Sequence, residues 1–236
     1  MDRVHAFAER PVDESQFVAV AIGESGVDQR HIGILHRRDG AAPELLHLAW
    51  HCRLKNDTEL PAYLTIWVAP SALQERLRNV AALCRRVWRK NGSGGIPYAF
   101  SSPQESFDAG TGAFLIGSTR YGLTCASFVL AIFDAAGLRI AEYSSWPVNR
   151  DGDCKWQEKI IECLSDHAEQ EHIDHLRGEI GAVRFRPEEV AAAAAIAPPP
   201  TSFDAAAELG SRILAKMLQI TLTSEANNPP DAGDHR

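Results

Sequence analysis

Short runs of apolar residues, separated by turn-forming residues, fill the first third of the chain. The runs at 17–22 and 31–36 predict two buried strands, because glycine and serine lie between them. The run at 45–54 alternates between apolar and polar positions and predicts a third strand, and the run at 64–68 predicts a fourth. Four strands joined by short turns favour a small antiparallel sheet.

Apolar residues recur at helical spacing in the rest of the chain. The helices that this spacing predicts lie at 71–90, 125–137, 156–176 and 203–222. The first begins with Ser71 and Gln74, which form a capping-box pattern. Further short strands are expected at 138–143 and 179–186. The pattern therefore predicts an α+β fold, in which an antiparallel sheet packs against helices.

The composition of the chain changes abruptly after residue 190. Residues 1–190 are expected to form one domain that carries the chemistry. Residues 191–202 predict a linker, because a run of alanines is followed by three prolines, which cannot continue a helix. Residues 203–223 predict a separate amphipathic helix whose apolar face is a candidate surface for a protein partner, and 224–236 predict a disordered tail.

The charge of the chain limits the classes of partner. The chain has 236 residues and a net charge of −7, so it lacks the broad positive field that binding to nucleic acid requires. The arginine-rich stretch 76–90 predicts the solvated side of a helix, with a site for an acidic substrate as the alternative. No apolar run is long enough for a membrane span, and residues 1–10 do not resemble a signal peptide. We expect a cytoplasmic protein, and export by a non-classical route stays open.

Five cysteines at irregular spacing, with no CxxC pair, favour reduced thiols over a disulfide framework or a zinc knuckle. Cys163, His167, His172 and His175 are close in sequence and suggest a metal site. On one helix, however, the first pair and the second pair face different directions, so a solvated helix face explains them better. No metal and no cofactor are expected.

Cys125 stands at the start of a predicted helix. The unpaired N–H groups and the positive dipole of a helix N-terminus favour a thiolate, which is a nucleophile. A buried structural cysteine would give the same pattern. The helix alone therefore leaves both interpretations open.

A cysteine nucleophile needs a base and a group that orients the base. His31 opens a predicted strand, with the small Gly33 two residues later, and His47 lies on the following strand. The two histidines share a face of the sheet in only one of two pairing registers, and the sequence does not determine which. His36 and His51 form the alternative pair on the same strands.

These residues resemble a known family. Arg30-His31-Ile32-Gly33-Ile34-Leu35, a turn, and Leu45-Leu46-His47-Leu48 look like the first two strands of the circularly permuted NlpC-type papain-like superfamily, which includes lecithin retinol acyltransferase-like proteins and bacterial YiiX-like hydrolases. The resemblance implies a papain-like fold. It also implies that the first histidine is the catalytic base, that the second orients it, and that the nucleophilic cysteine follows later at the head of a helix, as Cys125 does.

The segment Gly95-Ile96-Pro97-Tyr98-Ala99-Phe100 is similar to the one that precedes the cysteine in that superfamily. The resemblance implies that Tyr98, with the Cys125 backbone N–H, stabilises an oxyanion. A half-buried aromatic residue in a turn is the other interpretation.

The chain departs from the family pattern in three places. The spacing from His31 to His47 is longer than usual, so His51 is an alternative third member of the triad. Thr124 precedes the cysteine where the family often has Asp or Asn. Ala126 and Ser127 replace the glutamate-histidine pair of the acyltransferases, which weakens an acyltransferase assignment.

The resemblance therefore implies a thiol hydrolase that cleaves an amide, in a peptide or an isopeptide, or an ester. Cys125, His31 and His47 would form the triad, and Tyr98 and Thr124 would line the oxyanion and substrate side. An acyltransferase or lipid hydrolase on the same fold is one alternative. A catalytically silent papain-like binding module is another, since a fold does not prove an activity.

Overall fold

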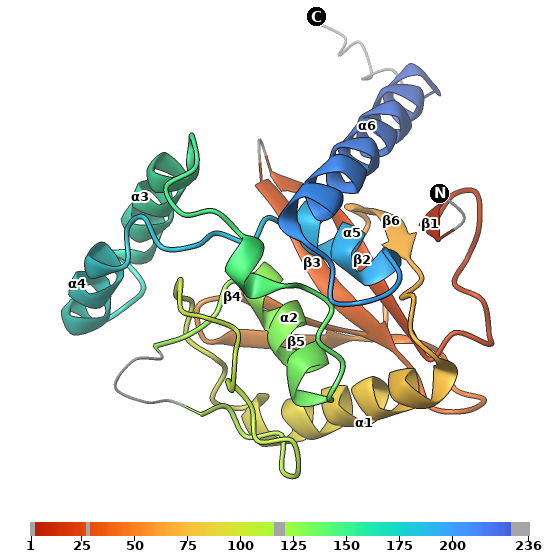
Figure 1. Ribbon diagram of the computed structural model, residues 1–236, viewed down its shortest axis with the longest axis horizontal. Coiled ribbons are helices and arrows are strands. Elements are labelled where there is room, and N and C mark those ends of the chain that lie inside the picture. Colours follow the sequence, from red (N-terminus) through yellow and green to blue (C-terminus); the bar gives the residue numbers. More distant parts are fainter. Residues whose placement is uncertain (1–2, 27–28, 116–120, 228–236) are drawn as a thin grey trace, which may run out of the picture.

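The computed structural model describes residues 3–26, 29–115 and 121–227, and a single antiparallel sheet forms its centre (Figure 1). The strand order is β1-β6-β2-β3-β4-β5, and all neighbouring strands are antiparallel. The strands are β1 (Val4–Ala6), β2 (Val18–Gly26), β3 (Gln29–His36), β4 (Glu44–Trp50), β5 (Arg53–Asp57) and β6 (Leu64–Val68). The predicted α+β class with an antiparallel sheet is confirmed.

Helices cover one face of this sheet. The helices are α1 (Gln74–Asn91), α2 (Cys125–Ala135), α3 (Asp153–Leu164), α4 (Gln170–Gly178), α5 (Pro187–Ala195) and α6 (Phe203–Asn227), with a 3₁₀ turn, η1, at Tyr143–Ser145. Alternate strand residues such as Ile34 and Leu46 face the main core, to which α1, α2 and α5 contribute. Figure 1 shows α3 and α4 as a pair at one side of the sheet.

The second face of the sheet carries a smaller apolar cluster. Leu35, Leu45 and Trp67 pack there against Phe7 from the N-terminal segment. The Trp67 indole N–H donates a hydrogen bond to the backbone oxygen of Arg10 over 2.9 Å. The sheet is therefore covered by protein on both faces.

The single strand predicted at 45–54 is wrong, because the chain reverses inside it. β4 ends at Trp50 and β5 begins at Arg53, and Cys52 between them has a φ of 52°, in the left-handed region. The hairpin pairs Leu45 with Asp57. The turn was not apparent from the sequence because its residues, His51 and Cys52, are not typical turn formers.

Two helix boundaries also differ from the prediction. The helix expected at 156–176 is two helices, α3 and α4, since the polar residues 165–169 interrupt it. The capping box at Ser71 does not form: α1 begins after Leu73 without a side-chain cap, and the Ser71 hydroxyl donates instead to the backbone oxygen of Ile196.

The two late strands were also predicted wrongly. Residues 138–143 contribute only an isolated bridge, between Ala141 and Thr201, before η1 begins. Residues 179–186 lie outside the helices and strands.

The predicted linker at 191–202 is also wrong in its first part. Ala191–Ala195 belong to the buried helix α5, whose small side chains let it pack closely between the sheet and α6. Helix α6 is confirmed, and its residues Ile213 and Met217 are buried in the core of the same chain. Of the predicted tail, 224–227 continue α6, and 228–236 lie outside the described residues.

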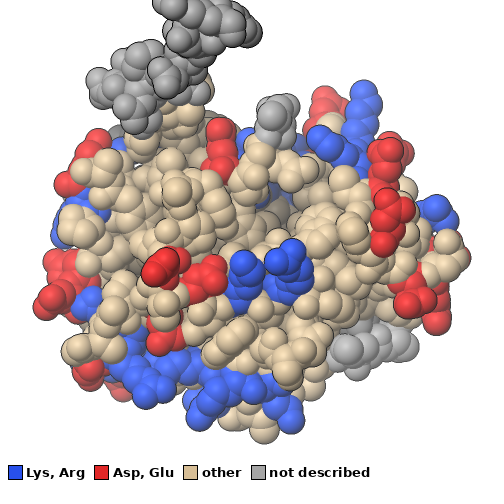
Figure 2. Space-filling model, turned by 180° about the vertical axis from the view of Figure 1, so that it is seen from behind, with Lys and Arg blue, Asp and Glu red and all other residues tan. Residues whose placement is uncertain are grey.

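The arginine-rich stretch forms the solvated side of α1, as expected. Arg76, Arg78, Arg89 and Lys90 are exposed while Leu77 is buried. Figure 2 shows Lys and Arg gathered along the lower edge of the back face, where α1 runs. Among the described residues, no helix combines the length and the hydrophobicity that crossing a membrane requires.

Candidate active site

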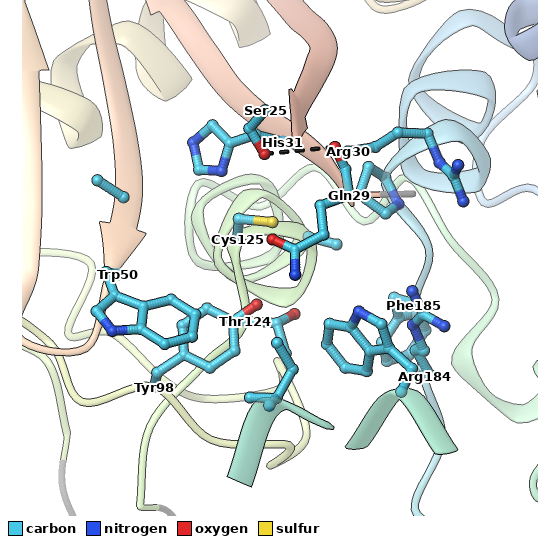
Figure 3. Close-up of a pocket in the computed structure, with 15 residues that line it drawn as sticks. Ser25, Gln29, Arg30, His31, Trp50, Tyr98, Thr124, Cys125, Arg184 and Phe185 are labelled. Carbon is cyan, nitrogen blue, oxygen red and sulfur yellow. Dashed lines mark hydrogen bonds between the residues drawn. The ribbon is translucent and has the colours of Figure 1, made fainter. Parts of the chain in front are cut away.

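A small cavity brings together four of the five predicted site residues (Figure 3). Its volume is about 70 Å³. The wall includes His31 from β3, Tyr98 from the loop after α1, Thr124 and Cys125 at the start of α2, and Arg184 from the segment before α5. His47 lies behind His31 and does not line the cavity. Residues distant in sequence thus converge on one thiol.

Thr124 caps the helix that carries the thiol. Its hydroxyl oxygen accepts a hydrogen bond from the backbone N–H of Ser127 over 3.1 Å, and the Ser127 hydroxyl oxygen accepts one from the backbone N–H of Thr124 over 2.8 Å. This reciprocal capping box satisfies N–H groups of the first turn. Thr124 therefore fixes the position of Cys125, the first residue of α2, in addition to lining the cavity.

The Cys125 thiol is neutral in this structure. Burial raises its pKa to about 11, although the backbone N–H groups of Ile32 and Ala126, the charge of Arg184 and the Tyr98 hydroxyl act in the opposite direction. The side chain is only 6% exposed. The thiolate expected from the helix N-terminus is therefore not the resting state, because desolvation outweighs the helix dipole and the hydrogen bonds.

His31 and His47 are in direct contact, so β3 and β4 pair in the register that places both histidines on one face. His31 Nε2 lies 2.7 Å from His47 Nδ1, and His47 Nε2 lies 2.9 Å from Asp57 Oδ2. The register of β3 and β4 sets Leu35 opposite Leu45, so alternation places both histidines on the same face.

This chain of hydrogen bonds determines which nitrogen is the base. A carboxylate only accepts, so His47 Nε2 carries a hydrogen and its Nδ1 accepts. His31 Nε2 must then be the donor, which leaves the lone pair on His31 Nδ1. The ring with this free acceptor lines the same cavity as the Cys125 sulfur. Asp57 therefore fixes the tautomer of both histidines through one contact.

Both imidazoles are held neutral. The pKa of His31 is lowered to about 3, first by burial and then by the nearby His47. Burial also lowers the pKa of His47, and the hydrogen bond and charge of Asp57 act against that shift. Among the hydrogen bonds of the described residues, none joins His31 to Cys125 Sγ. The Cys125 thiol and the His31 imidazole thus line one cavity as two neutral groups.

Gly33 makes the contact between the histidines possible. A Cβ atom at Gly33 would lie 2.8 Å from the Cβ of His47 and 2.9 Å from Cδ1 of Leu45. Such distances are shorter than normal van der Waals contact, so only glycine lets His47 pack across β3. The small residue two positions after His31 in the sequence thus accommodates His47.

Tyr98 lies in the same cavity wall as Cys125. It is buried and lines the cavity beside Cys125, whose backbone N–H and sulfur both act on the pKa of the Tyr98 hydroxyl. Burial raises the pKa of Tyr98 well above its usual value, so the hydroxyl keeps its proton.

The other candidate histidines have different partners. His51 Nδ1 accepts a hydrogen bond from the backbone N–H of Tyr98 over 3.3 Å, and His172 Nε2 donates to the backbone oxygen of Tyr98 over 2.9 Å. His36 Nε2 pairs with Asn56 over 2.9 Å. His51 and His172 therefore hold the loop that presents Tyr98, and neither is the partner of His31.

The metal site considered from the sequence does not form. Cys163 lies on α3, and His172 and His175 lie on α4, where they contact Tyr98 and Tyr121. Within the described ranges, no group of three or more His, Cys, Asp or Glu side chains has the arrangement that a metal ion needs.

Sequence reasoning missed Asp57 and Arg184. Asp57 was hidden because the hairpin that places it opposite Leu45, beside His47, interrupts a run that looked like one strand. Arg184 was hidden inside a segment predicted to be a strand. The alternation of Arg53 to Asp57 was the available signal for the first, and the sequence offers no comparable signal for the second.

Comparison of the chain with protein-family models, with curated proteins and with solved structures finds no match.

Proposed function

We propose that the protein is a thiol hydrolase of the permuted papain-like type, which cleaves an amide or ester bond through an acyl-enzyme. The observation that carries the proposal is the ordered series Asp57–His47–His31 beside the Cys125 thiol. Each hydrogen bond in it has a single consistent direction, and the series ends on a free imidazole lone pair in the cavity that contains the sulfur. Packing alone would not require the hydrogen bonds of two buried histidines to run in one direction toward the cavity.

The reaction follows from these groups. His31 Nδ1 takes the thiol proton of Cys125 while the sulfur attacks the carbonyl carbon of the substrate. The imidazolium formed on His31 keeps its Nε2 hydrogen bond to Nδ1 of His47. The contact with Asp57 keeps His47 in the tautomer whose Nδ1 accepts that bond. His31 then gives the proton to the leaving amine or alcohol, and water releases the acyl group by the reverse sequence.

The developing negative charge on the carbonyl oxygen also has partners. The backbone N–H of Cys125 and the hydroxyl of Tyr98 are adjacent, and each can donate to an oxyanion. We take water rather than an amine or lipid as the acceptor of the acyl group, because Ala126 and Ser127 replace the acyltransferase residues. Peptide and isopeptide amides are the proposed substrates.

An acylation experiment tests this function. The protein is mixed with p-nitrophenyl acetate, and the acetylated cysteine is identified by mass spectrometry of its peptides. We expect Cys125 to be acetylated at least about ten times faster than the exposed Cys163 and to be deacylated by water. Cys125→Ala should abolish the turnover, with a melting temperature within a few degrees of the unmodified protein.

His31→Gln should slow acetylation of Cys125 by about 100-fold or more, the contribution expected of a positioned base. Cys163→Ala is the matched control and should leave turnover unchanged. Full turnover by Cys125→Ala, or equal acetylation of Cys125 and Cys163, would contradict the proposal.

A further inference from the structure

A network of ion pairs reaches the wall of the cavity through one of its members, Arg184. Asp153, at the start of α3, accepts hydrogen bonds from Arg150, Arg184 and Arg186, and Glu189 of α5 pairs with Arg150. Three guanidinium groups therefore share two carboxylates, so the cluster has a net charge of +1. The Arg186 side chain is 29% exposed, so solvent screens its charge, whereas Arg150 and Arg184 are more deeply buried.

Arg184 is the member of the network that faces the nucleophile. Its side chain is 11% exposed and lines the same cavity as Cys125. Figure 3 shows it on the opposite side of the cavity from His31. Its charge also acts on the site, since it lowers the pKa of both Cys125 and Tyr98 against the effect of burial.

The hydrogen-bonding capacity of Arg184 is largely unused. Nη1 donates to Asp153 over 3.0 Å, and the guanidinium carbon lies 3.8 Å from the centre of the Trp156 ring, which stacks on one face of the group. A guanidinium has five N–H donors in its plane, so the stacking and one ion pair hold it without using the remaining edge. Arg150, by contrast, is bonded to Asp153, to Glu189 and to the backbone oxygen of Arg184.

The other arginine in the cavity wall is already neutralised. Arg30 Nε donates to Glu188 over 2.9 Å, in a pair whose carboxylate is almost completely buried. Arg184 is thus the arginine in the cavity wall that presents N–H donors to the cavity at the edge of a planar cation. Such an arrangement suits the two oxygens of a carboxylate.

We infer that Arg184 binds an anionic group of the substrate, and that the acyl compound carries a carboxylate close to the bond that is cleaved. This inference rests on the proposed function, because it assigns the substrate class of the same site. An acidic peptide or isopeptide fits it, while a neutral lipid ester does not.

Two alkylating reagents test the inference without knowledge of the natural substrate. Iodoacetate and iodoacetamide differ only in a carboxylate against a carboxamide. With either, the sulfur of Cys125 bonds to the methylene carbon, the carbon–iodine bond breaks, iodide leaves, and the thiol proton passes to His31 or water. Rates are measured at Cys125 by peptide mass spectrometry. The ratio of the two rates, divided by the same ratio for glutathione, cancels differences in the ionisation of the thiol.

We expect this normalised ratio to be about ten or more for the full-length protein, because a charged hydrogen bond assists only iodoacetate. Arg184→Gln should reduce the ratio to near one, and Arg184→Lys, which keeps the charge, should retain part of it. Arg139→Gln is the control, because Arg139 pairs with Asp134 away from the cavity. A ratio near one in the unmodified protein, or one unchanged by Arg184→Gln, would overturn the inference.

A competition experiment decides the question if Arg184→Gln does not fold. Sodium acetate should slow the reaction of the unmodified protein with iodoacetamide, while acetamide and sodium chloride at equal concentration should not. Equal effects of the three would overturn the inference. His31→Gln separates it from the proposed function: loss of the base should slow both reagents equally and leave their ratio intact. Absence of any reaction at Cys125, while Cys163 reacts, would overturn both proposals.

Discussion

The carboxylate of Asp57 is the residue that determines the direction of every hydrogen bond behind the base. It lies 2.9 Å from His47 Nε2, and its side chain is 31% exposed, so it remains in contact with solvent while the two imidazoles are buried. An ionised acceptor at this position forces His47 to accept from His31. The base is therefore defined by a residue that does not line the cavity.

Asp57→Asn should slow acylation of Cys125 by about two orders of magnitude, because an amide can present its N–H₂ to His47 and reverse the tautomers. The rate of acetylation by p-nitrophenyl acetate measures this effect. Asp39→Asn, in the exposed turn before β4, is the matched control and should have no effect. A rate for Asp57→Asn within a factor of two of the unmodified protein would exclude the proposed tautomer series.

Gly33→Ala should disrupt the hydrogen bond between His31 and His47 through a steric clash. The added Cβ would lie 2.8 Å from the Cβ of His47, so the His47 ring must shift away from His31. Overpacking of this kind costs about 1–3 kcal/mol of unfolding free energy. Denaturant titration measures that loss, and the acylation rate should fall further than the loss of folded protein explains.

Gly94→Ala provides the comparison for that variant, because nothing lies within 4 Å of a Cβ at Gly94. If Gly33→Ala kept both the stability and the acylation rate of Gly94→Ala, close packing of His47 on β3 would not be needed for activity.

At the scale of secondary-structure elements, α4 and the residue after it hold the loop that carries Tyr98. His172 donates to the Tyr98 backbone oxygen. Glu179 accepts hydrogen bonds from the backbone N–H of Phe100 and from the Ser101 hydroxyl, each over 3.0 Å. The position of Tyr98 thus depends on a helix that contributes no side chain to the cavity wall.

Glu179→Ala should loosen this loop. Buried donors of the loop lose their acceptor, at a cost of about 1–3 kcal/mol, and the acylation rate should fall because Tyr98 is no longer held at the sulfur. The same assay with Glu171→Ala, an exposed change on the same helix, should give unaltered values. An acylation rate in Glu179→Ala equal to that of Glu171→Ala would show that α4 does not position Tyr98.

The elements with regular apolar spacing are the ones that the sequence predicts well. The expected strands at 31–36 and 64–68 and the helix from Cys125 match β3, β6 and α2 closely, because each pattern runs uninterrupted between turn residues. The pairing of His31 with His47 was one of two possibilities, because the sequence left the register of β3 and β4 open and the structure determines it.

Other features depend on contacts that are distant in sequence. Alanines 191–195 resemble a linker by composition, and become a buried helix because the sheet and α6 enclose them. The sequence left both a thiolate and a buried thiol open for Cys125, because local helix geometry is visible in the sequence, whereas the burial that raises the pKa of Cys125 comes from β3, α3 and the segment before α5.

For the molecule as a whole, buried neutral histidines make stability depend on pH. Burial lowers the pKa of His31 to about 3, and it also lowers the pKa of His36 and His47. The unfolded chain therefore binds protons below pH 6.5 that the folded chain does not bind. Stability is fully present above pH 6.5 and is lost as the pH falls from there toward about 3.

Between pH 6 and 5, His31 alone should lower the unfolding free energy by about 1.4 kcal/mol per pH unit, because its pKa is about 3 in the folded protein, and His36 and His47 act in the same direction. Denaturant titrations at several pH values measure the slope of the unfolding free energy against pH. His31→Gln should reduce that slope by the contribution of one bound proton. An unfolding free energy that stays constant from pH 7 to pH 5 would contradict the burial of neutral imidazoles.

The wall of the cavity draws on residues from Ser25 to Pro187, so most of the chain must assemble before the cavity exists. Contacts between such distant residues close late in folding, because the loss of chain entropy precedes the gain from contact. The reactivity of the Cys125 sulfur therefore reports when the cavity forms during folding. During refolding, Cys125 should change from the reactivity of an ordinary thiol to its final value only in the last kinetic phase, after Cys84 of α1 has become shielded.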